Sequence, residues 1–276
     1  MKQVAPSKEH EKRTRTVWPG IRDSAATIGV FIALLLIWEG CVRLFHIQSF
    51  ILPAPSAVAV GLAQAVSDLT TIESIGNTMA STVMGFIVGA LTGMILAPLI
   101  FSSKLCARTL YPILVAIQTI PKVTLAPLML AWFGLGLAPK LILIGVITFF
   151  PVLANVLAGL GSVDQKRLDL FRMLHASRWQ TLMKLQYPAA LPYLFAALEV
   201  AAIYSLVGAI VVEFVGSQGG IGTILMQRNY DLDIPSVFAL IAILSTLGMV
   251  LHWIVRAIER HVVFWRGGRK EADNVI

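Results

Sequence analysis

The side chains best suited to chemistry lie in a polar segment, residues 162–192, between two long hydrophobic runs. The chain offers no convergent nucleophile or metal-ligand set, so this segment indicates recognition rather than catalysis. Leu168, Phe171 and Leu174 recur at helical spacing and predict an apolar ridge. A ridge flanked by positive charges is typical of a helix that binds in a groove of another protein, and a hairpin lying on the lipid surface is the alternative. The basic residues of the segment are Lys166, Arg167, Arg172, Arg178 and Lys184.

Two helix starts are expected within the polar segment. Ser162 and Gln165 have the spacing at which a hydroxyl and an amide satisfy each other's free backbone N–H groups. Ser177 and Gln180 repeat this spacing. Pro188 is expected to end the second helix, because proline has no N–H and disfavours helical geometry in the residue before it. The pattern predicts two short helices joined by a bend and presented to an aqueous partner.

A second candidate site lies within a hydrophobic run, residues 109–133. If this run is one helix, a rise of 1.5 Å per residue places Lys122 roughly 20 Å into it. If the run crosses a membrane, a lysine at that depth in the bilayer is energetically costly and is functional by default. Gln118 and Thr119 fall on the same helical arc, and prolines in the run leave backbone carbonyls without donors. We expect this polar stripe to line a translocation path, where Lys122 would favour an anionic or electron-rich solute.

Two acidic residues of a later hydrophobic run, Glu199 and Glu213, are included among the candidate path residues. A structural ion pair of Lys122 with one of them is the main alternative to path lining. The same helical rise places each carboxylate about 10 Å above or below the depth of Lys122, so neither is an obvious partner. Exposure of Lys122 to water is the third possibility.

Composition places the whole chain in the membrane class. Mean hydropathy is +0.79, with 57% hydrophobic and only 13% charged residues. Runs long enough to cross a bilayer predict an all-α, multi-pass membrane protein with six transmembrane helices. The first run is expected to be a retained anchor, because it is too long for a signal peptide and lacks a clean cleavage site. The six runs are residues 24–45, 77–101, 109–133, 139–160, 190–214 and 236–258.

The distribution of basic residues sets the expected orientation. With the N-terminus inside, 18 of the 22 lysines and arginines fall on the inner side. Both termini and the polar segment are therefore expected to be cytoplasmic. The predicted regions are a basic tail over residues 1–23, a membrane domain over 24–258 containing a cytoplasmic loop at 161–189, and a tail over 259–276. The basic runs are topological anchors, so no nucleic-acid partner is expected.

The predicted outer side carries three further features. Residues 47–76 form a long loop, interpreted either as a dock for an extracytoplasmic partner or as an extended connector. Glu39 and Arg43 have i,i+4 spacing and are expected to pair locally. Four glycines predict a tight turn before the last span, and an outer gate is the sharper alternative. They are Gly216, Gly219, Gly220 and Gly222. Neither a metal site nor a cofactor is expected, because the histidines and cysteines lack ligand spacing.

A family resemblance rests on the polar segment. Asp169 is followed by two bulky residues, His175 lies six positions after Asp169, and the segment closes at residues 188–192 with an apolar pair before a proline. This arrangement resembles the EAA loop of permease subunits of binding-protein-dependent ABC importers, with bulky residues in place of two alanines and His175 in place of the usual glycine. Histidine is enriched among non-glycine residues at positive φ, so the bend is expected to persist. The resemblance assigns ATPase coupling to Asp169, Leu170, Phe171, Arg172, Leu174, His175, Ala176, Ser177 and Arg178.

The resemblance extends beyond this loop to residues 120–134, 213–222 and 264–266, which are similar to the branch that imports nitrate, sulfonates, taurine and thiamine precursors. It implies a type I ABC importer permease fold in a bacterial plasma membrane, and no enzymatic activity or cofactor of its own. It also implies a cytoplasmic ABC ATPase dimer, an extracytoplasmic solute-binding protein, membrane lipid and a second permease copy, most simply an identical one. The expected cargo is a small anionic or heteroaromatic solute.

An ion-coupled secondary transporter is the alternative function. That class tends to contain inverted repeats with broken helices at matching positions. The sequence has no evident internal repeat, and six spans would be few for such a transporter. The ABC permease is therefore the preferred interpretation.

Overall fold

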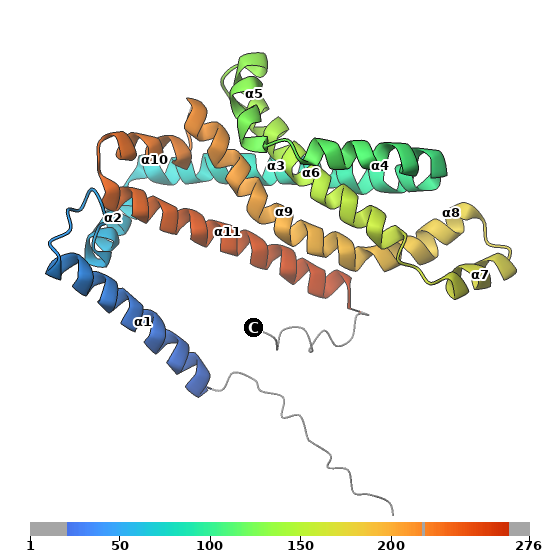
Figure 1. The fold of residues 1–276 in the computed structure, drawn as a ribbon, viewed down its shortest axis with the longest axis horizontal. Coiled ribbons are helices and arrows are strands. Elements are labelled where there is room, and N and C mark those ends of the chain that lie inside the picture. Colours follow the sequence, from blue (N-terminus) through green and yellow to red (C-terminus); the bar gives the residue numbers. More distant parts are fainter. Residues whose placement is uncertain (1–20, 217–218, 265–276) are drawn as a thin grey trace, which may run out of the picture.

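The computed structural model describes residues 21–216 and 219–264, and every regular element in these ranges is helical (Figure 1). In chain order the elements are α1 (Ile21–Leu44), α2 (Pro55–Ser67), α3 (Leu69–Ser102), α4 (Lys104–Gln118), a 3₁₀ turn (Lys122–Thr124), α5 (Leu125–Phe133), α6 (Leu137–Leu160), α7 (Gln165–Met173), α8 (Arg178–Thr181), a π-helical turn (Leu182–Gln186), α9 (Tyr187–Gly216), α10 (Ile221–Tyr230) and α11 (Ile234–Val262). The predicted all-helical class is confirmed. Most of the two predicted basic tails lies outside the described residues.

Three long helices, α3, α6 and α9, form the centre of the bundle. The α3–α6 contact depends on small residues, since Gly85, Gly89 and Gly93 repeat every four residues and bring the two backbones close together. An ideal Cβ at Gly89 would lie 2.5 Å from the carbonyl oxygen of Gly145 on α6. Apolar side chains such as Leu153 fill the rest of the seam. A side chain larger than hydrogen at these positions would therefore push α3 and α6 apart.

Five helices in the described ranges are long and apolar enough to cross a membrane, compared with the six predicted. They are α1, α3, α6, the continuous α8–α9 helix and α11. The predicted third span, residues 109–133, is wrong as a single helix because the chain breaks between α4 and α5. Pro121 causes the break: it has no N–H to donate, it constrains the residue before it, and its own ψ is 105°.

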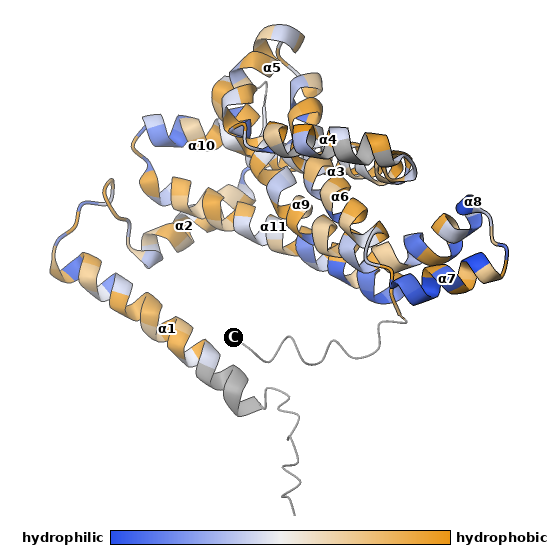
Figure 2. Cartoon of the chain, turned by 45° about the vertical axis from the view of Figure 1, so that its right-hand side comes forward, coloured by the Kyte–Doolittle hydropathy of each residue, from blue (hydrophilic) through white to orange (hydrophobic). Residues whose placement is uncertain are grey.

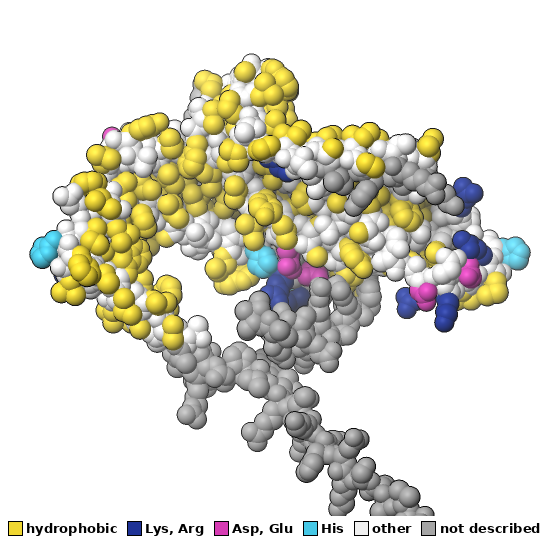
Figure 3. Space-filling model, viewed as in Figure 1, with side chains coloured by type: hydrophobic (Ala, Val, Ile, Leu, Met, Phe, Trp, Pro, Cys, Tyr) yellow, Lys and Arg dark blue, Asp and Glu magenta, His cyan; other side chains and the backbone are white. Residues whose placement is uncertain are grey.

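Helix α1 diverges from the bundle and approaches it near its C-terminal end (Figure 1). There Arg43 Nε donates to Glu39 Oε1 at 2.7 Å, which confirms the predicted local pair. Glu39 also accepts from the backbone N–H and the hydroxyl of Ser56, at 3.0 and 2.8 Å. The Trp38 ring lies 6.1 Å from that of Phe238 on α11. These contacts fix the end of α1 and leave most of its apolar surface exposed, as Figure 3 shows for this face of the molecule.

One helical rod runs from the polar segment to the far end of the bundle, because α8, the π-helical turn and α9 are continuous. The prediction that Pro188 ends this helix is therefore wrong. Pro188 is the second residue of α9, two positions after the π-helical turn. A π turn shifts hydrogen bonding to a longer register, which lets a helix continue past a residue without an N–H.

Candidate functional site

The polar segment folds as a hydrophilic helical hairpin, α7 and α8, at one end of the molecule (Figure 2). Asp164 caps α7, and its side chain accepts from the N–H of Lys166 at 3.4 Å. The predicted capping pair of Ser162 with Gln165 is wrong. The Ser162 hydroxyl instead donates to the carbonyl of Gly159, and Gln165 donates to Asp169. Asp is as effective an N-cap as Ser, so the helix begins after the aspartate.

The bend between α7 and α8 is a Schellman-type helix end centred on His175, whose φ is +53°. The N–H of Ala176 donates to the carbonyl of Phe171, and the N–H of His175 donates to that of Arg172, both at 3.0 Å. His175 Nδ1 also lies 3.1 Å from the Met173 carbonyl oxygen. The predicted positive φ at His175 is confirmed.

Helix α8 begins with the predicted capping box. The N–H of Gln180 donates to Ser177 Oγ at 3.1 Å, and the N–H of Ser177 donates to the Gln180 side-chain oxygen at 2.8 Å. Because both orphan donors are satisfied within the hairpin, α8 needs no external partner to hold its first turn. The hairpin is thus a rigid projection joined directly to the rod that crosses the bundle.

The apolar ridge of the hairpin differs from the predicted one. Leu168 and Phe171 are partly buried, whereas Met173 and Leu174 are 71% and 69% exposed. Trp179 on α8 adds a large exposed aromatic surface. The four-residue spacing of Leu170 and Leu174 in the sequence indicates this exposed face. The predicted ridge did not include Met173 and Trp179.

Charges surround this exposed ridge. Arg172 pairs with Asp169 at 2.7 Å on the surface of α7, and both side chains are more than half exposed. The side chains of Arg167 and Arg178 are exposed as well. Figure 3 shows these basic and acidic side chains gathered at the α7–α8 end. The arrangement fits a partner that has an apolar groove bordered by acidic residues.

Lys122 lies at the break between α4 and α5, not within a continuous helix. Its side chain is partly buried, and its Nζ donates to the backbone carbonyl of Gln118 at 3.0 Å. Thr119 is exposed, and its hydroxyl donates to the carbonyl of Ala116. The prediction of one helical arc is wrong, but the break still brings Gln118 and Lys122 together, because the freed carbonyl accepts from the ammonium group.

The structure separates the two glutamates from Lys122. Among the described residues Lys122 forms no ion pair with Glu199 or Glu213. Glu199 is partly buried midway along α9. Glu213 is 1% exposed and pairs with Lys140 of α6 at 2.8 Å, so the alternative of a Lys122–Glu213 pair is wrong.

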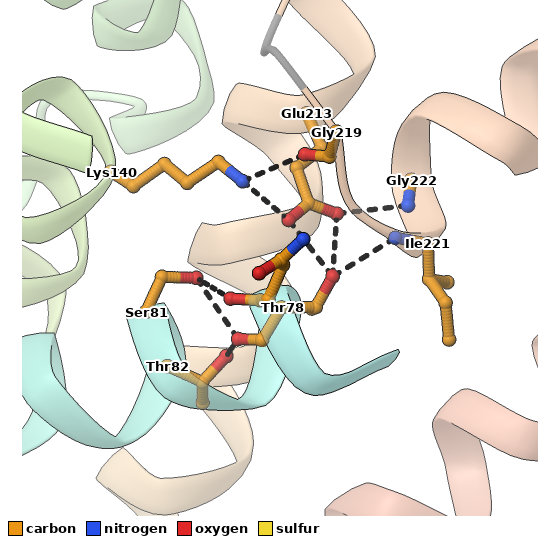
Figure 4. A network of polar contacts seen from close by, with 9 residues as sticks. Thr78, Ser81, Thr82, Lys140, Glu213, Gly219, Ile221 and Gly222 are labelled. Atoms are coloured by element: carbon orange, nitrogen blue, oxygen red, sulfur yellow. Dashed lines mark hydrogen bonds and ion pairs between the residues drawn. The ribbon is translucent and has the colours of Figure 1, made fainter. Parts of the chain in front are cut away.

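This buried pair forms the centre of a polar network (Figure 4). The network lies at the ends of α6 and α9 that point away from the hairpin (Figure 1). Lys140, only 5% exposed, also donates to the carbonyl of Gly219 at 3.0 Å. Glu213 accepts from the Thr78 hydroxyl at 2.9 Å and from the N–H of Gly222 at 2.8 Å. The predicted runs 139–160 and 190–214 place Lys140 at the outer end of one span and Glu213 at the outer end of the next. That coincidence was the missed signal for the network.

The glycine-rich turn between α9 and α10 closes around the Glu213 carboxylate. Gly216, Gly219 and Gly220 all have positive φ, as a tight turn requires. A Cβ at Gly220 would overlap the carboxylate, and one at Gly222 would lie 2.7 Å from Glu213 Cβ. The glycines therefore provide both the turn geometry and the room for a buried charge.

The predicted outer loop is not an extended connector, because residues Pro55–Ser67 of it form α2. Asp68 follows and caps α3, accepting from the backbone and hydroxyl groups of Thr70 and Thr71. These hydrogen bonds hold the pKa of Asp68 below its ordinary value, with the two hydroxyls as the largest contributors. The cap fixes the first turn of α3, the helix that carries Thr78.

The chain is similar to several transport permeases over most of its length. It is 31% identical to the formylaminopyrimidine transport permease protein ThiX of Halalkalibacterium halodurans, covering 86% of this chain and 94% of the relative. It is 31% identical to the riboflavin transport system permease protein RibX of Chloroflexus aurantiacus, covering 96% and 99%. It is 27% identical to the taurine transport system permease protein TauC of Escherichia coli, covering 97% and 99%.

A solved structure shares the fold. The MetNI methionine ABC transporter, in an inward facing conformation, matches with a TM-score of 0.62 and 21% identity, covering 69% of this chain and 95% of that chain. The predicted type I ABC importer permease fold is thereby confirmed. The alternative of an ion-coupled secondary transporter is set aside, because the relatives are transport system permease proteins.

The model of the family described as the inner membrane component of binding-protein-dependent transport systems matches residues 89–264, which include the α7–α8 hairpin, the break at Lys122 and the buried Lys140–Glu213 pair. Its members are multi-pass inner-membrane transport subunits that operate with an ATPase and a solute-binding protein. This chain belongs to that family.

Proposed function

We propose that two identical copies of this chain form the translocation path of an ABC importer, and that hydrolysis takes place in a separate cytoplasmic ATPase dimer. The observation that carries the proposal is the capped α7–α8 hairpin, which presents Leu174 and Trp179 on a rigid projection. Apolar anchors on a preorganised helix favour binding in a groove of a partner. The excess of basic residues on the hairpin side supports a cytoplasmic position for it.

A second copy follows from the number of hairpins. The chain carries one coupling hairpin and therefore engages one ATPase subunit, whereas ABC ATPases act as dimers in the family. Two copies related by a two-fold axis would present two identical hairpins to the two ATPase subunits. Lipid would cover the remaining apolar surface, including most of α1.

Substitution of Leu174 by aspartate should release the ATPase. Leu174 is exposed, so the change places a charge in the partner's apolar groove without disturbing the fold of the permease. We expect the affinity for the ATPase subunit to fall roughly 30-fold, since truncating a central anchor typically costs about 2 kcal/mol. Binding of purified ATPase to the permease in nanodiscs would measure this.

Leu232→Asp is the matched control. Leu232 is 64% exposed in the turn before α11, at φ +57°, where aspartate is tolerated. ATPase binding should be unchanged in this variant. Retention of full ATPase affinity by Leu174→Asp would contradict the proposed role of the hairpin.

For the cargo, we propose a small anionic or heteroaromatic solute. Relatives are named for formylaminopyrimidine, riboflavin, aliphatic sulfonates and taurine, which are flat heterocycles or sulfonates. We place Gln118, Thr119 and Lys122 along the path, because irregular backbone at membrane depth is tolerated only against protein or a water-filled cavity. Glu199 remains a candidate for the same path. Glu213, being enclosed, is assigned to the network rather than to the path.

Replacement of Lys122 by methionine should reduce transport of anionic solutes selectively. The ammonium group lowers the energy of an anion passing a low-dielectric region, and methionine keeps the length without the charge. We expect uptake of an alkanesulfonate to fall about tenfold relative to riboflavin, with Lys122→Arg close to the wild type. The measurement is the rate of solute uptake into proteoliposomes that contain the complete transporter. An equal loss of uptake rate for all solutes would contradict the proposal that Lys122 lines the path.

A further inference from the structure

The two members of the buried ion pair lie at equivalent places on two helices. Lys140 is the fourth residue of α6, and Glu213 lies three residues before the end of α9. The other end of α6 leads into α7, and α9 continues from α8. Along α6 the distance from Lys140 to Leu160 is about 30 Å at 1.5 Å per residue. The pair therefore ties together the far ends of the two helices that flank the coupling hairpin (Figure 1).

Four parts of the chain converge on this pair. Lys140 comes from α6, Glu213 from α9 and Thr78 from α3, and the backbone of the glycine turn contributes Gly219 and Gly222. The Thr78 hydroxyl also accepts from the N–H that opens α10, at 2.9 Å. A buried pair with these additional hydrogen bonds has one well-defined geometry, because each partner lacks water as an alternative.

The hairpin end of the same two helices is joined differently. There Gly159 of α6 lies against Ala190 of α9, with an ideal Cβ on the glycine 2.8 Å from Ala190 Cα, and apolar residues such as Leu160 and Leu194 surround the contact. Dispersion and hydrophobic contacts have little directional preference, in contrast to an ion pair with hydrogen bonds. The two helices are thus joined by a directional polar contact at one end and by apolar close packing at the other.

From this asymmetry we infer that Lys140 and Glu213 are positioning residues that form the pivot of the transport cycle. The inference rests on the proposed function. Displacement of α7 and α8 by the ATPase becomes a rotation of α6 and α9 about the pair, and the pair transmits it to the glycine turn and α10. Without the pair the hairpin still binds the ATPase, but its movement is absorbed by slippage between α6 and α9.

The test compares the transmitted motion with and without the pair. The Lys140→Met/Glu213→Gln double variant removes both charges together, which avoids leaving one buried charge unpaired. A reporter cysteine is placed by Thr223→Cys on α10, in a background with Cys41→Ala and Cys106→Ala. The measured quantity is the rate of labelling by a membrane-impermeant maleimide in the complete transporter, with and without ATP and vanadate.

We expect ATP with vanadate to change the labelling rate about tenfold when the pair is intact, and less than twofold in the double variant, a loss in the usual range of coupling between sites. ATPase binding should be equal in both. A merely structural role would lower the yield of assembled transporter but leave the ATP-dependent ratio unchanged, and that result would overturn the inference. An ATP-independent rate with the pair intact would overturn it as well.

Two further variants keep the test decisive. Thr78→Val leaves the ion pair in place and removes only the hydroxyl between Glu213 and α10, so it should reduce the ratio about threefold in a chain that still folds.

The Arg228→Met/Asp233→Asn double variant neutralises an exposed ion pair at the same end, and asparagine retains the cap of α11. Its ratio should equal that of the wild type, and a ratio reduced as far as in the buried-pair variant would overturn the assignment. Loss of ATPase binding in the unmodified chain would instead contradict the proposed function.

Discussion

The Gly220→Ala variant should be destabilised by roughly 5 kcal/mol, which combines backbone strain with the loss of a buried ion pair. Gly220 has φ +125° and ψ 162°, a region that side chains enter only at a cost of about 2 kcal/mol. Its added Cβ would also overlap the Glu213 carboxylate, displacing it from Lys140. Disrupting a buried ion pair typically costs about 3 kcal/mol more. The apparent melting temperature of the purified subunit would measure the loss.

Gly216→Ala is the matched control for this prediction. Gly216 also has positive φ, at +145°, but an ideal Cβ there meets nothing within 4 Å. It should therefore show only the backbone strain, about 2 kcal/mol. Equal melting temperatures for the two variants would show that the enclosed carboxylate contributes nothing measurable to stability.

The α7–α8 hairpin was predicted best from sequence because its structure is determined locally. Ser177 and Gln180 find each other three residues apart, and the φ of His175 follows from the demands of a helix end. The N-terminal cap was misassigned to Ser162, because Asp164 offered a second acceptor of equal quality two residues later. Neighbouring caps of similar strength cannot be ranked without knowing where the preceding helix ends.

In the third hydrophobic run, the high hydropathy hides the helix break at Pro121. Hydropathy over residues 109–133 predicts a span, and the run is long enough for one. Pro121 was recognised as a source of free carbonyls, but its effect on the helix axis was underestimated. The two nearest N–H groups, those of Thr119 and Ile120, form tight i−3 bonds and end α4. The freed carbonyl of Gln118 then binds Lys122.

The polar network was missed because its members are far apart in sequence. Thr78 and Glu213 are separated by 135 positions, so no spacing along one helix marks them as partners. Lys140 lies at the start of the predicted run 139–160, and its position there gives no sign of a partner on another helix. Spacing within one helix identifies faces, whereas contacts between helices require the packing that the glycines of α3 permit.

The bundle itself should fail when Gly89 is replaced by leucine. A Cβ at Gly89 would lie 2.5 Å from the Gly145 carbonyl oxygen and 2.8 Å from Thr148 Cβ, and the backbone of α6 cannot move aside without separating from α3. Overpacking at such a contact costs about 3 kcal/mol. We expect the amount of folded subunit recovered from membranes and its melting temperature both to drop sharply.

Gly76→Leu provides the comparison on the same helix. Gly76 is exposed on α3, with nothing within 4 Å of an ideal Cβ, so leucine there adds helix propensity and no clash. This variant should be at least as stable as the wild type. If Gly89→Leu were equally stable, close backbone approach would not hold α3 to α6. The two helices would then be free to separate, and the Thr78 hydroxyl on α3 would have no fixed position from which to orient the Glu213 carboxylate.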